Sequence, residues 1–396
     1  MTLSTDRATL SLTAAWLINS LAYSIIYPFI PLYLHQDRGF PMTQVGMIFP
    51  LMGLATILAP PLFGALTDRF GRRPVMQLGQ HGRAAVFLLL ASAAWMQSPF
   101  AVFACLLMAS TALGCGFQVA AQSYLADITT PEKRSLYYGW TAIGCNIGWA
   151  VGPILGSCMT GVPFYLLFLL TAVLCSAGGA VSFLLCPEPD RQTAGAKQSA
   201  FAFVGVLTNR ALLELLFAAF LLTMLTSQLY STLSVFATGN VGIPRNRLGM
   251  VYSVNGFTVI CCQQAMTHLL ERLKVPASRR LMLGAGLYIA GYFAMGFCPG
   301  AWYMACCVFV LTLGEIIVQP GLYSATAKLV TPDMFGRAMA ARSLAGGIGF
   351  SIGPWFGAIV YARWNTSPIL LWGILASFGL AAAIGFFRTG RTLDRG

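Results

Sequence analysis

The stretch GWAVGPILG at residues 148–156 recurs as GFSIGPWFG at residues 349–357, 201 positions further along a chain of 396 residues. A Thr-Pro pair precedes each copy by the same interval, at residues 130–131 and 331–332. Gln118 and Gln319 are related by that interval too. The chain is therefore predicted to be a duplication of one unit. The shared pattern is Gly-x-x-x-Gly-Pro-x-x-Gly, formed by Gly148, Gly152, Pro153 and Gly156 and again by Gly349, Gly353, Pro354 and Gly357.

This spacing predicts helix packing. Small residues four positions apart allow two helices to approach backbone to backbone. A proline inside a helix bends it, because it lacks the amide N–H that the preceding turn needs. We therefore expect both copies to lie where two helices cross.

The composition around the repeat is typical of a protein embedded in a membrane. Hydrophobic residues make up 57% of the chain and charged residues 9%, against about 25% charged in an average soluble domain. Since a helix needs roughly 20 apolar residues to cross a bilayer core, the sequence predicts an all-α membrane protein with twelve transmembrane helices. The predicted spans are residues 10–34, 43–67, 75–96, 99–126, 137–160, 163–186, 211–237, 247–270, 280–298, 300–327, 338–361 and 367–387.

A polar stretch divides the twelve predicted spans into two sets of six. It covers residues 187–210 and carries Glu188, Asp190, Arg191 and Lys197 among small residues. We predict an N-terminal six-helix bundle at residues 1–186, a cytoplasmic linker at residues 187–210, and a pseudo-symmetric C-terminal six-helix bundle at residues 211–396. Paired membrane bundles are the architecture of secondary transporters, which move a solute by rocking one half against the other.

The basic residues are unevenly distributed between the two sides of the predicted spans. The chain has 24 Lys and Arg against 12 Asp and Glu. Cytoplasmic loops are enriched in Lys and Arg, so the richer side, to which Arg83 is assigned, is predicted to be cytoplasmic together with both termini. Charges spread over short loops argue against nucleic-acid binding, which needs a basic face. The poorer side carries only Arg38, Arg245, Arg247 and Arg363.

The loop between the second and third predicted spans, GALTDRFGRRP at residues 64–74, combines glycines with clustered charges. The glycines predict close helix approach and a tight turn, and an acid beside three arginines at a membrane edge predicts a salt-bridge cluster. If the arginines only determined topology, neither the acid nor the glycines would be needed. The residues concerned are Gly64, Asp68, Arg69, Gly71, Arg72 and Arg73.

This loop resembles the signature Gly-x-x-x-Asp-x-x-Gly-Arg-Arg of the major facilitator superfamily. The resemblance implies two six-helix bundles and a gate formed by the loop. Asp68 would then meet the start of the helix that begins near Arg337. Arg72 would pair with Asp127 in the charged segment that ends at Arg134. The corresponding loop of the second half, residues 271–280, keeps charges but lacks the glycines, so the gate is expected to be asymmetric.

Two further motifs concern direction and coupling. Residues 148–156 resemble the helix-5 motif of the antiporter branches of that superfamily, which favours export over uptake. Proton-coupled drug exporters also carry, in helix 4, an arginine four residues before a Gly-x-Gly. Here Gly114-Cys115-Gly116 is present, but Ser110 stands at the position of that arginine. Protons are the expected coupling ion, although this sequence lacks that arginine.

One acidic residue is predicted to lie deep in the membrane. Glu315 is near the middle of the span at residues 300–327, and ionisable residues at such depth are functional candidates because their burial is costly. Gln319 and Tyr323 follow at intervals of four and share its helix face.

By the same resemblance, the first, fourth, seventh and tenth spans line a central cavity. Two interpretations of their polar side chains remain open, since amides and tyrosines either bind substrate or hold helices together. Besides Glu315, Gln319 and Tyr323, the candidates are Asn19, Tyr23, Tyr27, Gln118, Gln122 and Gln228, with Asn146 and Asn255 as weaker ones.

The expected cavity contains one acid with amides, hydroxyls and aromatic rings, and no buried arginine. It would suit a moderately apolar or cationic small molecule better than a phosphorylated anion. The function predicted is export of small amphipathic or cationic molecules by alternating access with proton antiport. The alternative is an uptake or facilitative carrier for a sugar, peptide or other metabolite.

Other classes of protein are less consistent with the sequence. An enzyme would need a catalytic constellation, and His35, His81 and His268 are scattered. A receptor would need an added soluble domain or long tail. The cysteines, including the adjacent pairs at 261–262 and 306–307, predict neither a metal site nor a cofactor. We expect a monomer in the bacterial inner membrane whose partners are substrate, protons and lipid.

Overall fold

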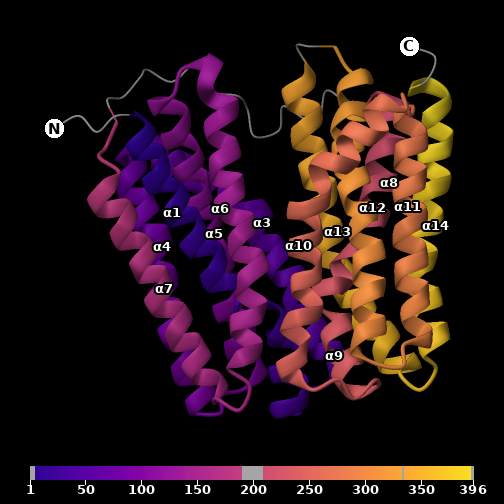
Figure 1. The fold of residues 1–396 in the computed structure, drawn as a ribbon. Helices are drawn as coiled ribbons and strands as arrows, with labels where there is room; N and C mark the ends of the chain where they lie inside the picture. Colours follow the sequence, from indigo (N-terminus) through magenta and orange to yellow (C-terminus); the bar gives the residue numbers. More distant parts are fainter. Residues whose placement is uncertain (1–4, 190–207, 332–333, 394–396) are drawn as a thin grey trace. The chain divides into compact units, whose positions relative to one another are not determined.

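Helices carry the regular structure of this protein (Figure 1). The computed structural model describes residues 5–189, 208–331 and 334–393, and within these ranges no strand occurs. The first half contains α1 (Thr5–Ser24), η1 (Tyr27–Phe29), α2 (Ile30–Leu32), η2 (Tyr33–Asp37), α3 (Met42–Phe70), α4 (Arg72–Trp95), α5 (Phe100–Ile128), α6 (Pro131–Cys158) and α7 (Phe164–Leu185). The second contains α8 (Arg210–Thr226), η4 (Ser227–Tyr230), α9 (Thr232–Gly239), α10 (Arg245–Arg272), α11 (Ala277–Ala294), η5 (Met295–Phe297), α12 (Ala301–Lys328), α13 (Phe335–Trp364) and α14 (Pro368–Leu393).

Each predicted span coincides with a helical segment of the described residues. The prediction of an all-α membrane protein is therefore confirmed, and the twelve predicted spans are consistent with the helices observed. Among the described residues, nine segments are long and apolar enough to cross a membrane. The segments α4, α6 and α10 fall outside this set. In α4 the apolar run is interrupted by Gln77, Gln80, His81 and Arg83.

The first span is a broken helix. Its apolar segment runs from Thr5 to Asp37, but Pro28 and Pro31 stand at the starts of η1 and α2. A proline removes a backbone donor and clashes with the preceding turn. The segment therefore changes from α-helical to 3-10 and π-helical winding at these residues and remains a single apolar segment.

The chain forms two compact units. The first consists of residues 1–40 and 54–197, and the second of residues 41–53 and 198–396. The limits predicted for the bundles at 186 and 211 stay a prediction, and residues 190–207 of the predicted linker lie outside the described residues.

Several helix contacts of unit 1 recur in unit 2. In unit 1, α1 packs against α6 and α7, and α4 packs against α5 and α7. In unit 2, α8 packs against α13 and α14, and α11 packs against α12 and α14. Each pair in unit 2 is the pair of unit 1 shifted by six spans. This correspondence is the structural form of the sequence duplication.

The repeated glycines lie at two of these corresponding contacts. In α6, a Cβ added to Gly152 would lie 1.8 Å from Ser24 Oγ of α1, and one added to Gly156 would lie 2.2 Å from Ile25 O. A Cβ added to Gly148 would lie 2.7 Å from Leu21 N. Only glycine permits α1 and α6 to approach this closely.

The copy in α13 has the same surroundings. A Cβ added to Gly353 would lie 2.2 Å from Ser227 Oγ, and one added to Gly357 would lie 1.9 Å from Gln228 Oε1. A Cβ added to Gly349 would lie 2.6 Å from Phe220 O. These partners belong to α8 and η4, which form the seventh span.

Hydrogen bonds to glycine carbonyls accompany both close contacts. Ser24 Oγ donates to Gly148 O over 2.8 Å. Gln228 Nε2 donates to Gly353 O over 2.7 Å. Each bond joins a polar side chain of the first span of a unit to the backbone of its fifth.

A substitution at Gly152 tests the importance of this packing. We expect Gly152→Ala to lower the free energy of unfolding by about 1–3 kcal/mol, because the added methyl group overlaps Ser24. Gly139→Ala is the matched control in the same helix, since a Cβ there meets nothing within 4 Å. Thermal unfolding of both purified variants in detergent measures the difference. Equal melting temperatures would show that the contact between α1 and α6 tolerates a larger residue.

Candidate functional site

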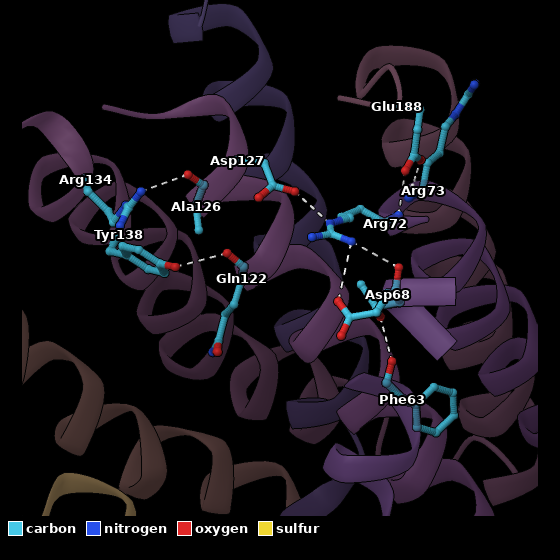
Figure 2. Close-up of polar contacts among 11 residues, drawn as sticks. Phe63, Asp68, Arg72, Arg73, Gln122, Ala126, Asp127, Arg134, Tyr138 and Glu188 are labelled. Atoms are coloured by element: carbon cyan, nitrogen blue, oxygen red, sulfur yellow. Dashed lines mark hydrogen bonds and ion pairs between the residues drawn. The ribbon is translucent and has the colours of Figure 1, made fainter. Parts of the chain in front are cut away.

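Unit 1 contains a cluster of charged side chains where α3, α4, α5 and the end of α7 meet (Figure 2). Arg72, the first residue of α4, is buried, and its Nε donates to Asp127 Oδ2 near the end of α5 over 2.6 Å. Its Nη1 lies 3.7 Å from Asp68 Oδ1 and donates to Thr67 O over 3.2 Å. The predicted pairing of Arg72 with Asp127 is thus present, and its role in gating stays a prediction.

Gly71 makes the turn between α3 and α4. Its φ of 103° lies in the region that glycine adopts without strain. A Cβ at this residue would also lie 2.4 Å from Glu188 Oε1. Both the turn and the approach of Glu188 therefore require glycine here.

Glu188, which follows α7, caps the amino terminus of α4. Its Oε1 accepts from the backbone N–H of Arg72 and its Oε2 from that of Arg73, each over 2.7 Å. The first N–H groups of a helix have no partners within it and carry partial positive charge, so a carboxylate is favourable there. The sequence places Glu188 in the predicted linker and contains no signal for this contact.

Arg73 and Arg134 hold neighbouring helix ends. The guanidinium of Arg73 donates to the carbonyl of Phe183 and lies 4.2 Å from the centre of that residue's ring. Arg134 Nη2 donates to Ala126 O over 3.0 Å, in the last turn of α5. Arg69 lies over the ring of Phe70, at 5.2 Å. A Cβ at Gly64 would meet nothing within 4 Å, so the close helix approach predicted at this residue is wrong.

The structure corrects the assignment of Arg83 to a cytoplasmic loop. Arg83 lies in the middle of α4 and is 4% exposed. Its Nη1 donates to Asn19 Oδ1 of α1 over 3.0 Å, and its Cζ lies 4.6 Å from the centre of the Tyr23 ring. The helix bundle of unit 1 thus contains a buried arginine that the sequence analysis had placed in a loop.

Arg83 also lies beside the Gly-x-Gly of α5. A Cβ at Gly114 would lie 3.1 Å from Arg83 Nη1. Ser110, which stands where drug exporters carry an arginine, is buried and donates to Leu107 O of its own helix. A guanidinium thus reaches the Gly-x-Gly of α5 from the neighbouring helix α4.

In unit 2, Glu315 belongs to a polar cluster inside the helix bundle. It lies about 20 Å from either end of α12, at 1.5 Å per residue. Asn255 Nδ2 of α10 donates to Glu315 Oε2 over 2.9 Å and to Thr312 Oγ1 over 3.0 Å. The hydroxyl of Tyr230 reaches Asn255 Oδ1 at 3.5 Å. Asn255, a weaker candidate in the sequence analysis, is the residue that connects this cluster.

The other candidates of the sequence analysis divide into two groups. Gln228 is buried, donates to Met224 O and Gly353 O, and accepts from Thr232. This places it among the residues that hold helices together. Tyr27 is also buried and packs in an aromatic cluster with Tyr23 and Trp149. The exposed candidates are Gln118, Gln122, Asn146, Gln319 and Tyr323.

Tyr323 has a cationic neighbour within unit 2. The Cζ of Arg342 in α13 lies 3.9 Å from the centre of its ring.

Among the residues searched in the described ranges, no group of His, Cys, Asp and Glu suits a metal ion.

The duplicated helix contacts and the charges held within each unit define a multi-pass membrane protein of the secondary-transporter class. The model of the Major Facilitator Superfamily matches residues 12–354, which is most of the chain. The chain belongs to this family, as its loop at residues 64–74 indicated.

Two curated relatives are resistance proteins. The class B tetracycline resistance protein of Escherichia coli is 30% identical over 128 residues, which cover 31% of this chain and 30% of the relative. The multidrug resistance protein MdtG of Citrobacter koseri is 34% identical over 87 residues, which cover 20% of this chain and 21% of the relative. The chain thus spans less than a third of the length of each.

A solved structure matches over the whole chain. It is a bacterial homologue of the human lysosomal transporter Spinster in an inward-facing and unoccupied conformation. The TM-score is 0.83 at 15% identity, and the match covers 100% of this chain and 98% of the other. At this identity the likeness shows a shared fold.

The cap formed by Glu188 can be tested by removing its charge. We expect Glu188→Gln to lower the free energy of unfolding by about 1 kcal/mol, because a neutral amide loses the interaction with the helix terminus. Thermal unfolding in detergent measures the change.

The matched control for this charge removal is Glu214→Gln. Glu214 pairs with Arg210, whose side chain is 93% exposed, over 3.3 Å, and such surface pairs contribute about 0–1 kcal/mol. If both variants melted at the same temperature, the charge of Glu188 would contribute nothing measurable to stability at the amino terminus of α4, contrary to the prediction.

Proposed function

We propose that this protein exports small amphipathic molecules, cationic ones among them, by alternating access in exchange for protons. The names of the two resistance proteins and the resemblance of residues 148–156 to the helix-5 motif of antiporters support export. The observation that carries the proposal is Glu315, a carboxylate far from both ends of α12.

Glu315 can exchange a proton for a cation. An ionised carboxylate inside an apolar bundle is costly, so the group gains by binding either a proton or a positively charged molecule. Because the two occupants exclude one another, binding of a proton on one side releases the molecule there. This exclusion is the basis of antiport at Glu315.

Asn255 keeps Glu315 in place throughout such an exchange. Its N–H group donates to Oε2, and that oxygen can accept in both forms of the carboxyl group when the proton occupies Oε1. The orientation of Glu315 is thereby preserved while its charge changes.

The cluster around Arg72 serves as the gate in this proposal. Arg72 is held at the end of α5 by Asp127, whose side chain is 15% exposed, whereas the side chain of Asp68 is 53% exposed. Asp68 is therefore the member that can exchange partners as the conformation changes.

The proposal also includes a location and an oligomeric state. The termini lie in the cytoplasm of a bacterial cell, the chain crosses the inner membrane, and the unit of transport is the monomer.

A substitution at Glu315 tests proton antiport. Wild-type protein in proteoliposomes is expected to move a cationic dye against its gradient when a pH gradient is imposed. Glu315→Gln should reduce this accumulation at least tenfold, because a neutral amide at this place cannot bind a proton. Dye fluorescence during an imposed pH jump measures the flux.

Glu271→Gln is the matched control, since Glu271 is exposed at the end of α10 and its loss should leave the flux unchanged. An unaltered pH dependence in Glu315→Gln would contradict the role of Glu315. Accumulation of the dye by intact cells, in place of depletion, would instead favour the uptake carrier.

A further inference from the structure

Arg83 is a permanent charge at depth in an apolar helix bundle. It lies about 16 Å along α4 from Arg72 at 1.5 Å per residue. Arginine stays protonated in proteins, so Arg83 cannot reduce the cost of burial by losing its proton. A charge in such a position needs compensation from its surroundings, and residues of this kind are candidates for function.

The described surroundings compensate Arg83 only in part. Among the described residues, no ion pair involves Arg83. Its contacts are the Asn19 oxygen and the faces of Tyr23 and Phe87, the latter at 5.7 Å. Its Nε is buried and has no hydrogen-bond partner.

A second unpartnered polar group lies on the same helix one turn earlier. Gln80 is fully buried, and neither its amide nitrogen nor its oxygen has a hydrogen-bond partner. Residues three apart in a helix lie on one face, so Gln80 and Arg83 face the same neighbours. Buried amides without partners are rare in native proteins.

Glycine provides the space around both groups. Gly114 of α5 flanks the guanidinium, and a Cβ at Gly178 of α7 would lie 3.4 Å from Gln80 Nε2. The ring of Tyr23 lies against the guanidinium as well. Tyr23 is half-buried and packs against Tyr27 and Trp149 with ring centres 4.8 Å and 6.1 Å away. Tyr23 therefore contacts both the guanidinium of Arg83 and this aromatic cluster.

We propose that Arg83 and Gln80, together with the aromatic cluster of Tyr23, Tyr27 and Trp149, form a binding site in unit 1 for an aromatic carboxylate. The carboxylate accepts hydrogen bonds from the guanidinium fork, which matches its two oxygens. The aromatic body of the ligand packs on the tyrosine and tryptophan rings. The inference rests on the proposed transport function and extends its substrates to acidic and zwitterionic amphipathic molecules.

Binding of two naphthalene derivatives tests this site. The probes are 2-naphthoate and its neutral isostere 2-naphthamide, measured by equilibrium dialysis against the purified full-length protein in detergent, with protein-free micelles subtracted. The wild type is expected to bind naphthoate about ten to a hundred times more tightly, the range for a hydrogen bond to a charged group. Equal affinities would overturn the proposal.

Two substitutions at Arg83 locate this preference. In Arg83→Gln the ratio of the two affinities should fall to about one. In Arg83→Lys it should be intermediate, because lysine keeps the charge and loses the fork. Arg38→Gln is the matched control, since Arg38 also lies over two rings, those of Phe40 and Phe103. The ratio of the two affinities measured for this variant should equal that of the wild type. A preserved ratio in Arg83→Gln would overturn the proposal.

Asn19→Asp keeps the test decisive if Arg83→Gln does not fold. A carboxylate at residue 19, where the amide oxygen lies 3.0 Å from Arg83 Nη1, would form an ion pair and compete with the ligand. The ratio should again fall to about one, while a purely structural Arg83 would leave it unchanged.

Dialysis requires no gradient, so this test is separate from that of export. Preferential naphthoate binding without pH-driven dye flux would contradict only the export proposal. Dye flux with equal affinities for both probes would contradict only the site at Arg83.

Discussion

A bilayer core offers no water to polar groups, so every donor and acceptor inside this protein must find a partner within it. The structure meets this constraint at many places through contacts between helices, whereas Gln80 and the Nε of Arg83 have no hydrogen-bond partner. Ser24 and Gln228 each bond to a glycine carbonyl of a neighbouring helix, and Asn255 bonds to Glu315 across α10 and α12. Such bonds need backbones that lie close together, so the glycine repeats and the polar contacts depend on each other.

The two units share several helix contacts and differ in their charges. Arg83 lies in the third span of the first unit, and Glu315 lies in the tenth, which is the fourth span of the second. Packing constrains both copies in the same way because α1 with α6 and α8 with α13 face the same steric problem. Charge is free to diverge, since each buried ionisable group needs partners only within its own unit.

The sequence predicted the twelve spans and the role of the repeat well, because hydropathy and glycine spacing are local properties of a helix. Arg83 was misplaced because a single arginine eight residues into a predicted span is counted with its loop, and its burial depends on Asn19, Tyr23 and Gly114 from other helices. Glu188 was assigned to the linker for the same reason. Its partners, the N–H groups of Arg72 and Arg73, are 116 and 115 residues away, and no local sequence pattern predicts these contacts.

The packing of α1 also has a consequence for synthesis in the cell. Its main neighbours are α6 and α7, which end at Cys158 and Leu185. At about 5–20 residues per second, α1 waits on the order of 10 s or more after its own translation before these helices emerge. During that interval Ser24 lacks its bond to the carbonyl of Gly148 in α6. The first helix of this protein is therefore a candidate for protection by the insertion machinery or by a membrane chaperone until α7, the sixth span, is complete.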